Sequence, residues 1–551
     1  MTIAPVPAPR SAVERSEAFV LDGRTSVRAS AELRRVAELL REQLTPSTGL
    51  ALPLAAPDDE GDNQIVLAID GSLDPEAYRL RVAPDGIVIA GGDAAGVHHA
   101  TQTLRQLLPP EGLRSAAIRR DGWIVPGVDI VDGPAHRWRG LMLDTVRHFI
   151  PVREVLRIID LLSLHHMNVL HLHLTDDQGW RLQILRHPRL TEVGSWRLST
   201  QVGRGEEDGR PHGGYYTQDD IREIVAYAAD RHITVVPEIE SPGHARAALA
   251  AYPELAVGGV APDGVWTQWG ISEDVFSVEE STIAFLCDVL DEVIELFPSA
   301  YIGIGGDECP KTRWRDDART QERMRELGLD DEDQLQAWFV GRLEQHVRAR
   351  GRRIFGWDEI LEGGAAADFG AGTAVASWRG DVGARVAARR GFDVVACPAD
   401  RVYLDYRQSE RADEPVPVGI PLTWRDVYAF EPVPSGLTAD EARHVLGGQG
   451  NLWLEHIDTP QRVDYMLFPR LGALAEALWT GAGRDADDFS RRMPEYLRRL
   501  EALGVDYRPE AGPHPWQTWP GVPGSVRTRA ELDEHLARIT AGIVESGVGQ
   551  G

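Results

Sequence analysis

Eight short apolar segments, separated by longer stretches with helical periodicity, recur between residues 140 and 451. Helical patterns such as Val152–Leu164, Thr217–Arg231 and Thr282–Phe297 lie between several of them. Strands that alternate with helices pair in parallel, and eight such units close into a barrel. We therefore predict an α/β fold with a (β/α)8 barrel, whose strands are Gly140–Asp144, Val169–Leu174, Thr234–Glu238, Tyr301–Gly305, Arg353–Trp357, Thr373–Ser377, Asp393–Ala396 and Leu446–Asn451.

The residues before the barrel predict a small α+β domain. Ser30–Leu44 has apolar residues at three- and four-residue spacing, which predicts a helix, and Asn63–Asp70 is a strand candidate. Tyr78–Ala90 alternates around a Pro-Asp-Gly turn and predicts a hairpin, and Asp93 is placed to cap a second helix. We interpret Val125–Pro134, which contains Pro and Gly, as the exit from this domain.

The remaining segments complete the division of the chain. Asp400–Arg443 is the longest insert and is expected to form a large loop before the eighth strand. The tail from about residue 484 is expected to be mostly helical. We therefore predict a noncatalytic α+β domain (residues 1–133), a catalytic barrel (134–483) and a helical tail packed on the barrel (484–551).

Charge and composition exclude several partners. The 551 residues include 58 Lys and Arg against 85 Asp and Glu, a net charge of −27. So acidic a chain argues against nucleic acids and anionic membranes, which bind Lys/Arg clusters. No apolar stretch is long enough to span a membrane, and the N-terminal residues lack the apolar run of a signal peptide. We expect a cytoplasmic protein with no nucleic-acid or membrane partner; oligomeric state is left open.

Carboxylates and tryptophans follow the predicted strands. In (β/α)8 barrels the active site lies at the C-terminal ends of the strands. Tryptophan offers a flat apolar face to the C–H face of a sugar, and carboxylates bind hydroxyls and transfer protons. This combination indicates a carbohydrate substrate. The residues are Asp144, Arg147, Asp176, Asp177, Trp180, Glu238, Glu240, His244, Asp307, Glu308, Trp357, Asp358, Glu359, Trp378, Tyr403, Asp405, Trp424, Asn451, Trp453 and Glu455.

Two other functions are kept as alternatives. His171 and His173 form a His-x-His pair on a predicted strand, as in metal-dependent hydrolases built on this barrel. Such sites need further His and Asp ligands and often a bridging lysine, and the one lysine, Lys311, follows the fourth strand. We therefore interpret both histidines as packing or supporting groups. The other alternative is a noncatalytic sugar-binding protein, against which the adjacent Asp307 and Glu308 argue.

Eight motifs in order resemble the β-N-acetylhexosaminidases of glycoside hydrolase family 20. The resemblance covers about residues 136–480, and the preceding block resembles the noncatalytic domain of that family. Each motif alone is weak, but their shared order and approximate spacing make the resemblance strong. The motifs are GLMLDTVRHF (Gly140–Phe149), NVLHLHLTDDQGWRLQI (Asn168–Ile184), VVPEIESPGHA (Val235–Ala245), YIGIGGDE (Tyr301–Glu308), GWDE (Gly356–Glu359), SWRG (Ser377–Gly380), YLDY (Tyr403–Tyr406) and NLWLE (Asn451–Glu455).

The resemblance implies a catalytic role for three residues. Glu308 would be the general acid/base, Asp307 would accept the N–H of the substrate's acetamido group, and Tyr403 would donate to the acetamido oxygen. That oxygen would attack the anomeric carbon to give an oxazolinium intermediate, with retention of configuration. A carboxylate that accepts the N–H is favoured more as positive charge builds on the nitrogen, so it stabilises the transition state.

The resemblance also implies how the sugar is held. Arg147 would bind the 3- and 4-hydroxyls, Glu455 the 4- and 6-hydroxyls, and Asp405 a further hydroxyl. Asp176 and His244 would support the Asp-Glu pair. The pocket would be lined by Trp357, Trp378, Trp424 and Trp453.

The implied substrate is an oligosaccharide or small glycoside with a terminal, non-reducing β-linked N-acetylhexosamine. N-acetylglucosamine and N-acetylgalactosamine are both candidates, as are chitin oligomers and glycan termini. No cofactor and no metal are expected, so activity should survive a chelator such as EDTA.

Overall fold

The computed structural model describes residues 3–543 except 60, 120–121, 261 and 365–368. Eight parallel strands close into a barrel, which confirms the predicted fold class. Every residue of the barrel strands except Thr234, Tyr301, Arg353 and Asp393 is buried, because helices cover the outer face. In barrel order the strands are β10 (Trp138–Asp144), β11 (Val169–His173), β16 (Thr234–Ser241), β17 (Tyr301–Gly305), β18 (Arg353–Trp357), β19 (Ala374–Ser377), β20 (Asp393–Ala396) and β22 (Val445–Leu452).

Amphipathic helices pack around the barrel. In α3 (Val152–Leu164), Val155, Ile158, Ile159 and Leu162 recur at helical spacing and are almost fully buried in the main hydrophobic core. Burying each such side chain contributes about 1.5–3 kcal/mol. Other long helices at the barrel are α5 (Gln218–Ala229), α7 (Glu280–Leu296), α10 (Glu332–Ala349), α11 (Asp381–Arg389) and α16 (Arg470–Thr480).

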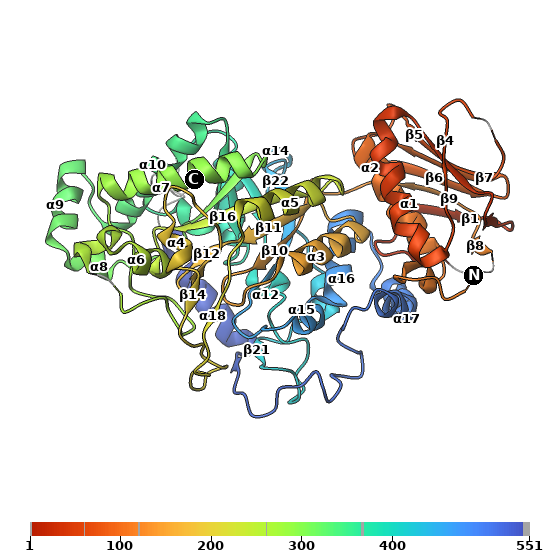
Figure 1. Ribbon diagram of the computed structural model, residues 1–551. Coiled ribbons are helices and arrows are strands. Elements are labelled where there is room, and N and C mark those ends of the chain that lie inside the picture. Colours follow the sequence, from red (N-terminus) through yellow and green to blue (C-terminus); the bar gives the residue numbers. More distant parts are fainter. Residues whose placement is uncertain (1–2, 60, 120–121, 261, 365–368, 544–551) are drawn as a thin grey trace.

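A seven-stranded sheet and two helices form the N-terminal domain, shown in red and orange beside the barrel in Figure 1. The predicted hairpin is β6 and β7, and Asp93 caps α2 by accepting the backbone N–H of Gly96. In sheet order the strands are β1 (Ser11–Glu14), β9 (Val128–Asp132), β6 (Tyr78–Ala83), β7 (Gly86–Gly91), β5 (Gln64–Ile69), β3 (Ser26–Ala29) and β4 (Leu54–Ala55), with helices α1 (Arg34–Thr48) and α2 (Ala94–Leu107).

Most of the predicted exit from this domain is a strand and not a linker. Val125–Pro134 contains β9, which pairs with both β1 and β6, and it also contains the end of β8 (Trp123–Val125). Alternate residues of β9 are buried against the sheet's core, so its Pro-Gly flank marks a turn between strands.

The prediction of a mostly helical tail is wrong for its middle. Among the described residues after 484, helix is found in α17 (Ala486–Ala502), in α18 (Arg529–Ile539) and at residues 541–543. The long blue stretch between α17 and α18 in Figure 1 has no helix, and it includes β23 (Ser525–Val526), which pairs in parallel with β21 (Val418–Gly419). In the described part of the chain, no helix combines the length and apolarity required to span a membrane.

Candidate active site

A cavity of about 370 Å³ opens at the C-terminal ends of the barrel strands. It brings together residues that follow or end seven of the eight barrel strands and residues near the end of the described chain. Of the predicted site residues it contains Arg147, His244, Asp307, Glu308, Trp357, Trp378, Tyr403, Asp405, Trp453 and Glu455; it also contains Trp269, Gly270, Ile271, Tyr406, Val418, Gly419, His456, Ile457, Ser525, Arg527 and His535.

The Asp307–Glu308 pair follows β17 on a sharp backbone turn. Gly305 and Gly306 have φ of 69° and 93°, and Glu308 itself has φ of 45°. A Cβ on Gly305 would lie 1.7 Å from Oε2 of Glu240, so only glycine fits there. The glycines of the YIGIGG motif therefore allow Glu240 to lie beneath the turn that directs the pair into the cavity.

His244 links the pair to Asp176. Its Nδ1 lies 3.2 Å from Asp176 Oδ1, and its Nε2 lies 3.6 Å from Asp307 Oδ2 and 3.8 Å from Glu308 Oε2. Burial lowers the pKa of His244, but Asp176 and then Asp307 outweigh it and hold that pKa well above its usual value. The ring is therefore a cation among carboxylates near neutral pH.

The two carboxyls of the pair are held in different environments. Burial raises the pKa of Asp307 to about 6, although the His244 cation opposes it. Burial also raises the pKa of Glu308. The Glu308 side chain is 35% exposed and that of Asp307 only 11%, so Glu308 faces the open side of the cavity. A raised pKa suits a carboxyl that must donate a proton.

Arg147 lies at the inner end of the cavity. It forms ion pairs of 2.8 Å with Asp176 and 3.3 Å with Asp144, and its guanidinium lies 4.9 Å from the ring centre of Trp453. Burial alone would lower its pKa, but these carboxylates raise it. The guanidinium is therefore fixed and charged at the cavity wall.

Aromatic rings form one wall. Trp378 stacks on Tyr403 at 6.3 Å between ring centres, and Trp357 lies 5.9 Å from Trp453. The Trp378 indole N–H donates to the carboxylate of Glu359, which fixes the ring. Such flat apolar surfaces suit the C–H faces of a ring-shaped ligand.

One carboxylate oxygen of Asp405 is free to accept a hydrogen bond from a ligand. Its Oδ1 is buried without a hydrogen-bond partner among the described residues. Burial, and then the nearby Glu455 carboxylate, raise the pKa of Asp405 well above its usual value. Because buried polar groups normally have partners, this oxygen marks a place for a ligand hydroxyl.

The prediction that Trp424 lines the cavity is wrong. It begins α13 (Trp424–Tyr428), and its ring packs 5.2 Å from that of Phe489 on α17. The insert between β20 and β22 turns this residue towards α17, while Tyr403 and Asp405 of the same insert face the cavity.

Several cavity residues were not predicted from the sequence. Trp269 and Ile271 lie in the loop before α7, and Ser525, Arg527 and His535 come from β23, the residue after it and α18. Trp269 lies too far along the chain from the end of β16 to be predicted as a cavity residue from its position. Only its residue type, tryptophan, pointed to a role for that loop.

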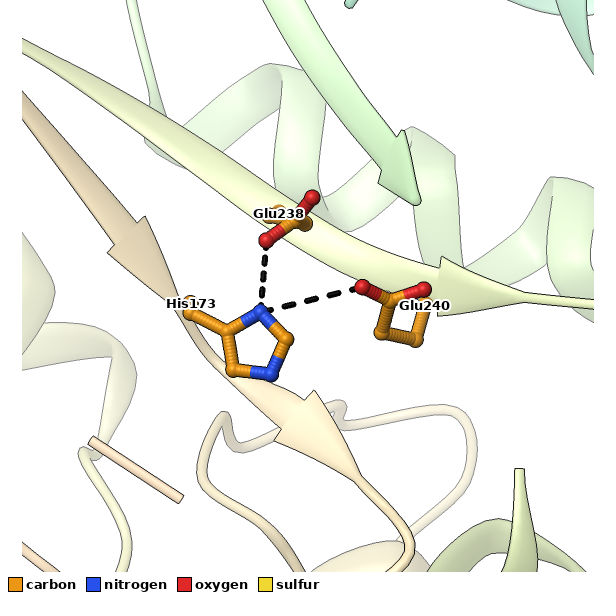
Figure 2. Close-up of side chains that lie close together, drawn as sticks. All are labelled: His173, Glu238 and Glu240. Atoms are coloured by element: carbon orange, nitrogen blue, oxygen red, sulfur yellow. Dashed lines mark hydrogen bonds and ion pairs between the residues drawn. The ribbon is translucent and has the colours of Figure 1, made fainter. Parts of the chain in front are cut away.

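A second ionic cluster lies inside the barrel beneath the cavity (Figure 2). Figure 2 shows Nδ1 of His173 facing both Glu238 and Glu240. It lies 2.6 Å from Glu238 Oε2 and 3.7 Å from Glu240 Oε1. Its Nε2 lies 3.0 Å from Asp176 Oδ2. Burial lowers the pKa of His173, but Glu238 and then Asp176 raise it to about 10.

The distances in this cluster would also allow a metal ion. His173, Glu238 and Glu240 lie close enough to hold a metal ion, as do Asp176, Asp177 and His244. Both ring nitrogens of His173 face carboxylates, so both are protonated donors and the imidazolium supplies the positive charge at the centre. The cluster therefore fits an ion network that supports the cavity from below.

Comparisons with known proteins agree with the geometry. Residues 136–482 match the glycosyl hydrolase family 20 catalytic domain, and residues 3–133 match domain 2 of that family. A beta-hexosaminidase of Porphyromonas gingivalis is 43% identical over 510 residues, which are 91% of this chain and 64% of that protein. The chain thus spans less than two thirds of that relative's length.

This chain covers nearly the full length of two similar solved structures. A family 20 beta-N-acetylhexosaminidase from Streptomyces coelicolor A3(2) superposes with a TM-score of 0.80 and 34% identity, covering 95% of this chain and 99% of that one. The Streptomyces plicatus N-acetyl-beta-hexosaminidase in complex with Thio-NAglucal has a TM-score of 0.79 and 36% identity, covering 92% and 97%.

Proposed function

Because the chain belongs to glycosyl hydrolase family 20, we propose that it hydrolyses terminal, non-reducing β-linked N-acetylhexosamine from oligosaccharides. The observation that carries this proposal is the Asp307–Glu308 pair, held by His244 in a cavity with tryptophan walls. The similarity to enzymes named beta-hexosaminidase supports the same activity.

Glu308 is the general acid in this proposal. Its pKa is raised by burial, and its side chain is the more exposed of the pair, so it can meet the oxygen of the departing group. It donates a proton to that oxygen and later removes one from the incoming water. Retention of configuration follows, because each of the two steps inverts the anomeric carbon.

The acetamido group of the substrate supplies the nucleophile. Its oxygen attacks the anomeric carbon as the glycosidic bond breaks, and an oxazolinium ring forms. Tyr403 donates to that oxygen and holds it in position, and Asp307 accepts the N–H as the nitrogen gains positive charge. Oδ1 of Asp307, which is buried without a hydrogen-bond partner in the described part of the chain, supports this acceptor role.

The inner end of the cavity then holds the sugar hydroxyls. Arg147 donates to the 3- and 4-hydroxyls, Glu455 accepts from the 4- and 6-hydroxyls, and Asp405 takes one more with its unpartnered oxygen. Both N-acetylglucosamine and N-acetylgalactosamine keep the groups that Tyr403 and Asp307 would bind.

The experiment is a series of aryl β-glycosides whose 2-acyl group is acetyl, mono-, di- and trifluoroacetyl. Fluorine weakens the acyl oxygen as a nucleophile with little change in shape, so kcat/KM should fall steeply along the series. The aryl β-glucoside without an acylamino group should hardly react. A flat series, together with a glycosyl adduct on any carboxylate seen by mass spectrometry, would exclude substrate assistance.

A further inference from the structure

The C-terminal segment forms part of the cavity mouth. Ser525, Arg527 and His535 line the cavity although they come after α17, at the end of the described chain. Residues of β23 pair with Val418 and Gly419 of β21, and the backbone N–H of Arg527 donates to the Gly419 carbonyl at 2.9 Å. The segment therefore lies against the insert that carries Tyr403 and Asp405.

Specific contacts fix this segment in place. A Cβ on Gly524 would lie 2.0 Å from the Pro417 carbonyl oxygen, so the two backbones approach closely only because glycine is present. Thr528 and Glu531 form a capping box at the start of α18. At the other end of α18, Arg379 donates to the Ile539 carbonyl at 2.6 Å. A wall anchored at both ends can position a side chain for binding.

Positive and negative side chains alternate on this wall, since residues 525–539 hold three arginines and three acidic residues. Arg527 is exposed at the cavity, and its guanidinium forms no ion pair among the described residues. The nearby Glu531 carboxylate instead accepts from the backbone and hydroxyl of Thr528. Arg407 donates to the Arg527 carbonyl at 3.4 Å, and Arg538 donates to His535 Nδ1 at 3.0 Å.

Burial, and then the charges of Arg527 and Arg538, lower the pKa of His535, so both guanidinium groups lie close to that ring. The other walls of the cavity carry the carboxyl groups of Asp307, Glu308, Asp405 and Glu455. A guanidinium without an ion pair at the mouth of a cavity attracts an anion to that place.

The position of this wall indicates which part of the substrate would contact it. The buried inner end, with Arg147, takes the sugar that is cleaved off, and the more exposed Glu308 faces the departing oxygen. The group beyond the scissile bond must therefore extend towards the mouth, where Arg527 lies.

We propose that Arg527, with Ser525 and His535, forms a leaving-group site for an acidic sugar. This inference rests on the proposed function. The ligand is the carboxylate of a sugar residue that directly follows the cleaved N-acetylhexosamine. Arg527 binds that carboxylate through its guanidinium, and the Ser525 hydroxyl is placed to donate beside it.

The experiment compares two disaccharides, N-acetylglucosamine β-linked to the 4-hydroxyl of glucuronate and of glucose. They differ only in a carboxylate against a hydroxymethyl group. The expected kcat/KM ratio favours the glucuronate by about two- to five-fold, the range of an exposed ion pair. Arg527→Gln should bring the ratio to about one, and Arg527→Glu should reverse it. Added salt should reduce the wild-type ratio by screening.

Arg529→Gln is the matched control. Arg529 lies two residues away on the same segment and pairs with Asp400 outside the cavity lining, so its loss removes one positive charge and one anchor of α18. The wild-type ratio should persist in this variant. The thermal unfolding midpoint of each variant establishes that it is folded.

Two results would overturn the leaving-group site. One is an equal ratio in the wild type and in both Arg527 variants. The other is an Arg527-dependent preference for 6-O-sulfated over unsulfated aryl N-acetylglucosaminide, which would place the anion on the cleaved sugar. Failure to hydrolyse any N-acetylhexosaminide, including aryl ones, would instead contradict the proposed function itself.

Discussion

Nδ1 of His244 lies 3.2 Å from a carboxylate oxygen of Asp176. This contact connects the Asp307–Glu308 pair to the residues that follow β11. It also keeps the imidazole protonated, so a positive charge faces both members of the pair. The protonation states of Asp307 and Glu308 therefore depend on a residue that the substrate need not touch.

His244→Gln should shift the acidic limb of the pH profile of kcat/KM. Asp307 must be ionised to accept the acetamido N–H, and the His244 cation lowers its pKa. Without that cation the Asp307 pKa rises, and the acidic limb should move up by about one pH unit or more. His346→Gln, on the outer helix α10, is the control and should leave the profile in place. An unchanged acidic limb in His244→Gln would contradict the coupling.

Glu308→Gln should lower kcat/KM by about 10²–10⁴-fold on substrates with poor leaving groups. The reason is that glutamine cannot protonate the departing oxygen. With dinitrophenol as leaving group the first step should lose far less, since that oxygen needs little protonation. Steady-state rates on both classes check this, and an equal loss on both would count against Glu308 as the acid.

Asp307→Asn should lower kcat by about 10–100-fold or more on an aryl N-acetylglucosaminide, because it removes a charge-assisted hydrogen bond. The amide also offers an NH₂ group towards the acetamido N–H, which misorients the nucleophile. A variant with near-normal kcat would show that Asp307 has another role.

Glu240→Gln and Glu238→Gln should change the stability of the protein in opposite directions. Both oxygens of Glu240 are buried without hydrogen-bond partners among the described residues, although Oε1 lies 3.7 Å from His173 Nδ1. Burial, then Asp307, raise the pKa of Glu240 well above its usual value. The native state therefore loses stability relative to the unfolded state as pH rises above about 4.5, by up to about 1.4 kcal/mol per pH unit. Glu240→Gln should remove that loss and raise the thermal unfolding midpoint at pH 7, with little difference at pH 4.

Glu238→Gln is the contrasting variant. Burial would raise the Glu238 pKa, but His171 and His173 lower it to about 2, so its stabilising charge is present above about pH 4.5 and is lost towards pH 2. Breaking this buried pair at pH 7 should cost about 3–5 kcal/mol. A lower unfolding midpoint for Glu240→Gln than for Glu238→Gln would disprove this assignment of charges.

Trp453→Leu and Trp424→Leu should separate binding from packing. Trp453 packs against Arg147 in the cavity, so its loss should lower kcat/KM by about 10-fold or more. Trp424 packs on Phe489, so Trp424→Leu should cost about 1–2 kcal/mol of stability with kcat/KM nearly unchanged. Measurements of kcat/KM and of thermal unfolding on both variants test these two roles. A loss of kcat/KM in Trp424→Leu alone would show that Trp424, and not Trp453, contacts the substrate.

The barrel was predictable because its strands are buried on both faces and read as continuous apolar runs. β9 was not, because only alternate residues are buried and a Pro-Gly pair precedes it, so its pattern resembles a linker. A strand within a sheet of mixed direction depends on partners that lie far away in the sequence.

The Asp307–Glu308 position was predictable because parallel strands end at one rim. The directions of side chains in long inserts could not be predicted. Trp424 lies many residues beyond Asp405, and the fold of the insert decides where its side chain points. Arg527 had no local signal either, because β23 has two residues and its pairing with β21 is visible only in three dimensions.

The contribution of β23 and α18 to the cavity mouth also sets an order of events during synthesis. A ribosome makes all eight barrel strands before it reaches Arg527 and His535. The growing chain therefore passes through a stage that already contains Asp307 and Glu308 but has no wall beyond them. The opening of the cavity is the last part of the site to be made.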